Sequence, residues 1–210
     1  RRSDQAGLDA LVETIHQDGH AASGFLLNAA EPGSLEDLVA RVEADIGPIE
    51  VAVYNLGAQI GDRALADTSL KAFETGWRIG TFGLFRLACA LFPAMQALGH
   101  GTLLVTSSTA AMRGNGGQHS HAAAMGGRRM LCQSLNAEFA AKGIHVAHIV
   151  IDGPVDAPDT LGKLLGAELF QALRESRGNE HDGLLLPEQV AETYLHLARQ
   201  HRSTWTFELD

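Results

Sequence analysis

The sequence has 210 residues, of which 45% are hydrophobic and 20% are charged. These proportions are typical of a soluble globular protein, and a chain of this length buries roughly 70% of its unfolded surface, so we expect one domain spanning residues 1–210. The formal net charge of −9 at pH 7 argues against a nucleic-acid partner, because binding to phosphate backbones requires a basic surface.

Two further features bear on the compartment. No stretch approaches about 18 uninterrupted apolar residues, and the first ten residues lack the apolar centre of an export signal. Cys89 and Cys132 lie in apolar helical stretches without the spacing of a metal site, so we expect both to be reduced core residues. The expected location is the cytoplasm, without a membrane partner.

Helical and strand patterns alternate from the start of the chain. Residues 3–18 predict an amphipathic helix that ends at Gly19, where a left-handed residue is expected. Residues 22–28 predict a short apolar strand, and residues 34–46 predict a second helix. The apolar run 49–54 is typical of a parallel strand covered on both faces.

The same alternation continues to the end of the chain. Strands separated by helices of ten or more residues imply crossover connections, so the sequence predicts an α/β fold with a parallel sheet. The further elements, in order, are a long helix at 69–98, a strand at 102–106, a helix at 119–142, a strand at 145–151, a mobile helical flap at 156–183, a helix at 187–200 and an edge strand at 203–208.

Short motifs recur at the ends of these predicted strands. Asn55-Leu56-Gly57 and Thr106-Ser107-Ser108 each follow a strand, and His121 comes thirteen residues after Ser108. Met125 stands one helical turn after His121, and Asp152-Gly153-Pro154-Val155 follows the strand 145–151. In order and spacing the chain resembles the short-chain dehydrogenase/reductase family over essentially all 210 residues, beginning after that family's second strand.

The resemblance implies a Rossmann-type doubly wound parallel sheet in three layers. The family's first strand and the glycine-rich turn that cradles the pyrophosphate are missing from the sequence. A βαβ unit without its first strand would expose the middle of a parallel sheet. We therefore expect a truncated sequence, or one that omits disordered residues, rather than a protein that lacks this strand.

The resemblance also implies a catalytic site, but three of its four residues differ. Ser108 matches the serine that orients the substrate carbonyl. His121 stands where the family has its catalytic tyrosine, Met125 where it has the lysine that lowers the tyrosine pKa, and Gly80 where it has an asparagine. Asp152-Gly153-Pro154-Val155 resembles the segment with which the family holds the nicotinamide. In and just after this segment, Asp152 and Ala157 replace the family's usual proline and threonine.

Two interpretations of His121 remain open. An imidazole has an unperturbed pKa of about 6.5, so His121 would need no lysine to donate a proton, and turnover would then change near pH 6 to 7. Under this interpretation Met125 would contribute only packing. Alternatively, His121 is a polar residue in an eroded pocket that has lost its chemistry.

Cofactor binding depends more on backbone geometry than on these side chains. Arg1 and Arg2 follow the expected second strand, where a cationic fork pairs with the extra phosphate of NADP, so NADP is favoured over NAD. Asn28-Ala29 stands beside the expected adenine site. The cofactor-binding residues implied by the resemblance are Arg1, Arg2, Asn28, Ala29, Asn55, Leu56, Gly57, Met125, Gly153 and Val155.

Other kinds of site fit the sequence less well. His119 and His121 point to different helix faces at i, i+2 spacing, so no metal is expected. Ser107 or Ser108 with His121 could form a hydrolase dyad, but the sequence has no Gly-x-Ser-x-Gly elbow and no acidic residue evidently placed to orient the imidazole. The aromatic residues Phe73, Trp77, Phe82 and Phe85 suggest core and interface, because the corresponding helices of the family pack against symmetry mates in dimers or tetramers.

The sequence therefore predicts an NAD(P)-dependent oxidoreductase of the carbonyl reductase or alcohol dehydrogenase type, with atypical catalytic residues and a small-molecule carbonyl or alcohol substrate. The alternative is a non-catalytic family relative that acts as a nucleotide-binding sensor or as a partner-binding subunit. The loss of three site residues favours the alternative, and the retained Ser108 favours the enzyme.

Overall fold

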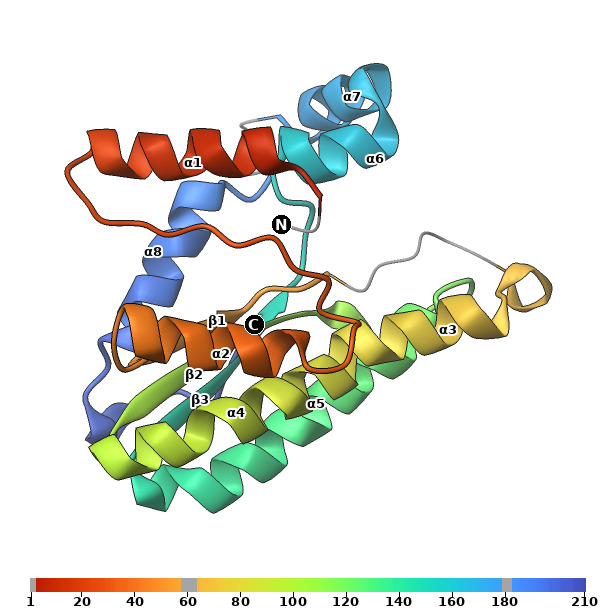
Figure 1. The fold of residues 1–210 in the computed structure, drawn as a ribbon. Helices are drawn as coiled ribbons and strands as arrows, with labels where there is room; N and C mark the ends of the chain where they lie inside the picture. The colour runs from red at the N-terminus through yellow and green to blue at the C-terminus, as the bar shows by residue number, and fades with distance from the viewer. Residues whose placement is uncertain (1–2, 58–63, 179–182) are drawn as a thin grey trace.

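A parallel β-sheet forms the middle layer of the computed structural model, which describes residues 3–57, 64–178 and 183–210 (Figure 1). In the described part of the chain the strands lie in the order β1-β2-β3-β4, and each pairs with its neighbour in parallel. The strands are β1 (Val51–Tyr54), β2 (Gly101–Ser108), β3 (Ile144–Ile151) and β4 (Glu208–Leu209).

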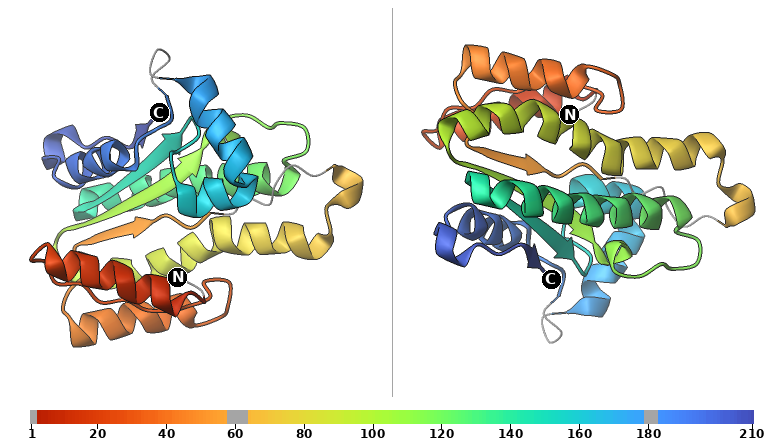
Figure 2. Two further views of the ribbon diagram at one scale, coloured as in Figure 1. Left: turned by 90° about the horizontal axis from the view of Figure 1, so that it is seen from above. Right: turned by 90° about the horizontal axis from the view of Figure 1, so that it is seen from below.

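Helices cover both faces of this sheet (Figure 2). One face carries α2 (Ser34–Asp45), α4 (Gly83–Leu98) and α5 (His119–Phe139), and the other carries α1 (Gln5–Gln17) and α8 (Pro187–Ala198). Side chains alternate along β2 as a pleated strand requires: Leu103 and Val105 pack with α4, whereas Leu104 packs with Leu197 of α8. The predicted three-layer Rossmann-type α/β fold is confirmed.

The segment 22–28 differs from its prediction as a strand, because it forms no strand in the structure. A strand is stable only when its backbone N–H and C=O groups pair with a neighbour. Within the described residues β1 is the edge of the sheet, where Val51 and Val53 are 46% and 50% exposed, and no strand lies beyond it. The prediction of a strand from apolar composition alone was therefore wrong for residues 22–28.

The last predicted strand, 203–208, is also shorter than expected. Residues Arg202–Thr204 form a 3₁₀ turn, and only Glu208 and Leu209 pair with β3. Trp205 instead stacks on the ring of buried His145, with ring centroids 4.9 Å apart.

The long helix predicted for residues 69–98 contains an irregularity. It consists of α3 (Leu70–Trp77), a π-helical turn (Arg78–Phe82) and α4, and Cys89 on α4 is exposed rather than in the core. By length and composition alone, Leu70–Leu98 could cross a membrane, with a mean hydropathy of 1.4 over its most apolar window, of which 39% is buried. A core helix meets the same criteria, and its core residues are Leu84, Leu91 and Met95.

A partly buried ionic cluster joins α5 to the two last strands. Glu208 of β4 accepts hydrogen bonds from Arg129 Nε and Nη2, at 2.6 and 2.8 Å, and lies 3.0 Å from Nδ1 of the fully buried His148 on β3. The Arg129 guanidinium lowers the pKa of the Glu208 carboxyl, and burial lowers the pKa of the His148 imidazole. Folding thus depends on an ionised Glu208 and a neutral His148.

This cluster predicts a loss of stability in acid. An unfolded chain takes up a proton on His148 below about pH 6.5, whereas the folded chain resists it, so the free energy of unfolding falls as pH decreases through that value. A second fall is expected below about pH 4.5, where unfolded Glu208 binds a proton. His148→Gln should reduce the first slope by up to about 1.4 kcal/mol per pH unit in urea titrations, since one proton is no longer linked to unfolding.

The exposed His20 provides the control for that measurement. His20→Gln should leave the dependence of unfolding free energy on pH unchanged. An unchanged slope in His148→Gln would show that burial of His148 does not govern acid stability.

Candidate active site

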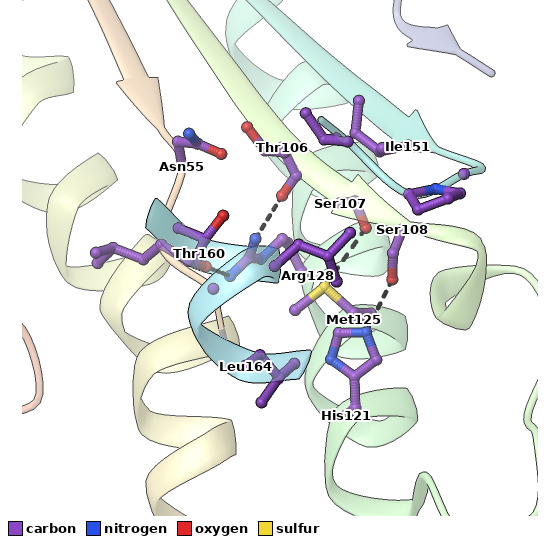
Figure 3. Close-up of a pocket in the computed structure, with 16 residues that line it drawn as sticks. Asn55, Thr106, Ser107, Ser108, His121, Met125, Arg128, Ile151, Thr160 and Leu164 are labelled. Atoms are coloured by element: carbon purple, nitrogen blue, oxygen red, sulfur yellow. Dashed lines mark hydrogen bonds between the residues drawn. The ribbon is translucent and has the colours of Figure 1, made fainter. Parts of the chain in front are cut away.

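A cavity of about 560 Å³ opens at the carboxyl ends of the strands, beneath the helical segment that follows β3 (Figure 3). Strand ends are where open parallel α/β sheets bind their ligands. Residues that follow β1 meet here with residues of β2, β3, α5 and the segment 153–164. The lining residues are Asn55, Leu56, Gly57, Thr106, Ser107, Ser108, His121, Met125, Arg128, Ile151, Gly153, Pro154, Val155, Thr160, Leu161 and Leu164.

Ser108 and His121 lie together in the wall of this cavity. Ser108 ends β2 and His121 lies in the first turn of α5, and a hydrogen bond of 3.0 Å joins Ser108 Oγ to His121 Nε2 (Figure 3). Both side chains are half-buried. The pair can therefore present a hydroxyl and an imidazole to one oxygen atom of a bound molecule, which is the geometry that proton transfer requires.

Met125 lies on the same side of α5 as His121, one turn later. Its side chain is only 2% exposed and packs with Ala110 and Ala124, and its sulfur lies 3.8 Å from the Ser107 hydroxyl. A thioether carries no charge, so Met125 contributes shape but no electrostatic effect at this position. Gly80 lies in the π-helical turn and is buried.

Among the described lining residues of the cavity, the cationic side chain is that of Arg128, which the sequence motifs did not identify. Its guanidinium donates to the carbonyl oxygens of Gly80 through Nε at 2.8 Å, of Leu56 through Nη2 at 2.9 Å, and of Thr106 through Nη1. Spacing could have revealed it, because Arg128 follows Met125 by three residues and so lies on the same helix face.

A second cavity of about 500 Å³ lies on the other side of Asn55-Leu56-Gly57, which lines both cavities. Asn28 and Ala29 line this second cavity together with apolar residues of α2, β1 and α4. Arg86 fixes the backbone here: it donates to the Ala29 carbonyl at 3.2 Å and pairs with Glu36 at 2.5 Å. Arg1 and Arg2 lie outside the described residues.

The predicted flap, 156–183, is helical over most of its described part. It contains a π-helical turn (Pro158–Gly162), α6 (Lys163–Leu165) and α7 (Ala167–Arg177). Arg174 of α7 donates two hydrogen bonds to Asp156 Oδ1, at 2.9 and 2.5 Å, which ties α7 to the first residue of the segment. Leu161 and Leu164 supply an apolar wall to the first cavity.

The structure thus brings eight predicted site residues into one cavity and places two others in the next. In the first are Asn55, Leu56, Gly57, Ser108, His121, Met125, Gly153 and Val155, and in the second are Asn28 and Ala29. Across the described ranges, no three His, Cys, Asp or Glu side chains lie close enough together to hold a metal ion.

A family model described as enoyl-(acyl carrier protein) reductase matches residues 2–208 of the chain. The chain belongs to the short-chain dehydrogenase/reductase family. This assignment confirms the resemblance seen in the order of the motifs.

Characterised relatives are similar at moderate identity. The chain is 29% identical to the 3-oxoacyl-(acyl-carrier-protein) reductase FabG of Escherichia coli over 154 residues, which cover 73% of this chain and 61% of that protein. It is 29% identical to the short-chain reductase protein NovJ of Streptomyces niveus over 202 residues, covering 95% and 76% of the two chains. The matched part is thus about three fifths of the length of the Escherichia coli enzyme.

Solved structures share the fold. A short-chain dehydrogenase from Rhodopseudomonas palustris superposes with a TM-score of 0.79 at 26% identity, covering 99% of this chain and 82% of that one. A metagenomic short-chain oxidoreductase in complex with NADP gives a TM-score of 0.77 at 19% identity, covering 97% and 80%. The second likeness concerns the fold alone.

Proposed function

We propose that the chain belongs to an NAD(P)-dependent oxidoreductase that interconverts a small carbonyl compound and its alcohol, with Ser108 and His121 as its catalytic residues. The observation that carries this proposal is the 3.0 Å hydrogen bond between Ser108 Oγ and His121 Nε2 in the wall of a strand-end cavity. Ser108 donates a hydrogen bond that orients the carbonyl oxygen, and His121 gives that oxygen a proton as the carbon is reduced. The C=O double bond then becomes a C–O–H group.

The cofactor supplies the hydride when it is bound. Two adjoining cavities, of about 560 and 500 Å³, share the wall Asn55-Leu56-Gly57 and together suit an elongated dinucleotide. Gly153, Val155 and Met125 would hold the nicotinamide half in the first cavity, and Asn28 and Ala29 would hold the adenine half in the second. Apolar Met125 packs there without supplying charge.

We propose NADP rather than NAD as the cofactor, on the basis of Arg1 and Arg2. A pair of guanidinium groups matches the geometry and charge of the extra phosphate of NADP, whereas NAD users favour an acidic residue at this place.

The test is a titration of the full-length protein with NADPH and with NADH, followed by cofactor fluorescence, and then assays of carbonyl compounds near neutral pH. Tighter binding of NADPH than of NADH, together with carbonyl-dependent NADPH oxidation, is the expected result. Binding of neither cofactor would contradict the proposal.

A second candidate function is a non-catalytic nucleotide-binding sensor or partner-binding subunit. The buried, uncharged Met125 favours it, because the family's lysine charge is absent from this position. Such a protein would bind a nucleotide or a partner but would oxidise no NADPH with any carbonyl compound tested. His121→Ala would then leave binding unchanged and would have no catalytic rate to lower.

We also propose a homodimer or homotetramer that associates through α3, the π-helical turn and α4. Four aromatic side chains are 37–48% exposed along these helices, and an apolar surface of this kind is typical of an interface between subunits. These residues are Phe73, Trp77, Phe82 and Phe85. The cytoplasmic location stays a prediction from the sequence.

A further inference from the structure

Arg128 is a buried cation in the wall of the first cavity. Its side chain is 2% exposed, and its three hydrogen bonds reach carbonyl oxygens on three different elements: Leu56 after β1, Thr106 in β2 and Gly80 in the π-helical turn. The guanidinium therefore lies where these three segments meet, beside Met125 (Figure 3).

No carboxylate bonds to Arg128 within the ranges that the structure describes. Arg86, Arg129 and Arg174 each pair with a carboxylate, whereas the titratable groups that act on Arg128 are Tyr54, Cys132 and Tyr194, which are neutral at pH 7. Burial lowers the pKa of Arg128, but a guanidinium remains protonated at neutral pH. Three carbonyl oxygens and the ring of Tyr54, whose centroid lies 5.1 Å from the guanidinium carbon, solvate this charge, but no anion neutralises it in the described structure. A buried cation of this kind favours a negatively charged ligand.

The guanidinium also has N–H donors that make no hydrogen bond to the three carbonyl groups. A guanidinium carries five N–H groups, and the three hydrogen bonds leave one N–H on each terminal nitrogen of Arg128. Two such groups on one planar fork match the spacing of two oxygens on a phosphate or of neighbouring sugar hydroxyls.

The position along the cavity identifies which part of a ligand meets this fork. Arg128 bonds to Leu56, which lines both cavities, and it follows His121 by seven residues, or roughly 10 Å along α5. The guanidinium therefore contacts the wall that separates the two cavities, whereas His121 bonds to Ser108 elsewhere in the first cavity. In a dinucleotide, the junction of the two cavities is occupied by the sugar–phosphate link rather than by the reacting ring.

We infer that Arg128 binds the ribose and phosphate oxygens of the nicotinamide half of the cofactor. This inference rests on the proposed function, because it takes a dinucleotide as the occupant of the cavities. In the family one lysine both lowers the pKa of the catalytic tyrosine and grips the ribose hydroxyls of the cofactor. Here Arg128 takes over the second role, and the first is not needed because an imidazole replaces the tyrosine.

The experiment compares two conservative variants, Arg128→Lys and Arg129→Lys, in the full-length protein. The probes are nicotinamide mononucleotide, which represents the nicotinamide half, and adenosine 2′,5′-bisphosphate, which represents the adenine half of NADP. Calorimetric titration of each probe gives its dissociation constant. We expect Arg128→Lys to weaken mononucleotide binding by about tenfold or more, since the fork is lost, and to leave bisphosphate binding within about twofold. Arg129→Lys, whose partner is Glu208, should change neither constant.

Either of two results would overturn the inference. Arg128→Lys could leave mononucleotide binding unchanged, or it could weaken both probes equally, as a purely structural clamp would.

A measurement on the protein without any substitution tests the inference even if Arg128→Lys does not fold. Nicotinamide mononucleotide should bind at least about tenfold more tightly than nicotinamide riboside, which lacks the phosphate, since a buried cation without a carboxylate favours the anionic probe. Equal binding of the two would contradict the inference.

Failure of the proposed function would look different. If the protein binds NADPH through Arg128 but oxidises it with no carbonyl compound, the inference stands and the oxidoreductase does not. If NADPH is oxidised and Arg128→Lys binds the mononucleotide normally, the oxidoreductase stands and the inference is overturned.

Discussion

Replacing His121 with alanine is expected to lower kcat for carbonyl reduction by about 10²–10⁴-fold, the usual contribution of a positioned general acid or base. His121 is the titratable side chain that hydrogen-bonds Ser108, so its loss removes the proton donor while Ser108 remains. The Kd for NADPH should stay within about twofold, because the proposed cofactor contacts lie elsewhere in the cavities. Steady-state kinetics and a fluorescence titration of the same preparation measure both quantities.

His119 supplies a matched control. It lies on the same helix two residues earlier and is exposed, so His119→Ala should retain full activity. Full activity in His121→Ala would instead show that the imidazole does not transfer the proton, and that the histidine mechanism is wrong.

The largest expected effect on stability is that of Gly143→Ala. Gly143 connects the end of α5 to β3 with φ of +90°, and a Cβ at this position would overlap the carbonyl oxygen of Gly99, at the turn between α4 and β2. The left-handed backbone costs a non-glycine residue about 1–2 kcal/mol, and separation of the two turns adds to that cost. We expect a total of at least about 3 kcal/mol and a decrease in Tm of about 6–12 °C. Thermal unfolding followed by circular dichroism measures it.

Gly99→Ala separates the two contributions. Gly99 has a similar φ of +77°, but a Cβ there meets no atom within 4 Å. This variant should lose only about 1–2 kcal/mol, the backbone cost alone. Equal losses in the two variants would show that the close approach of the turns does not matter.

Much of the fold follows from local patterns along the chain. The apolar runs of β1, β2 and β3 and the periodicity of α1, α2, α5 and α8 predict these elements to within a few residues. Alternation of strands and helices implies parallel pairing, and parallel pairing brings strand ends to one edge of the sheet. For that reason the sequence alone predicts that the motifs at Asn55, Ser108 and Gly153 share a site.

Other features depend on contacts between distant residues, which a local pattern does not encode. Residues 22–28 have the composition of a strand but no strand to pair with in the described structure, and pairing decides whether an apolar segment becomes a strand. The π-helical turn at Arg78–Phe82 interrupts a sequence that reads as one continuous helix.

The sequence by itself determined the α/β architecture, the family and the residues at the strand ends, because each of these is set by periodicity and by spacing along one chain. Only the tertiary structure decided that Ser108 and His121 share a hydrogen bond and that Arg128 lies buried against three carbonyl groups. The physical reason is that hydrogen bonds and buried charges depend on which segments meet in space. Their energies are set by partners and by solvent exclusion, and neither is a property of a short stretch of sequence.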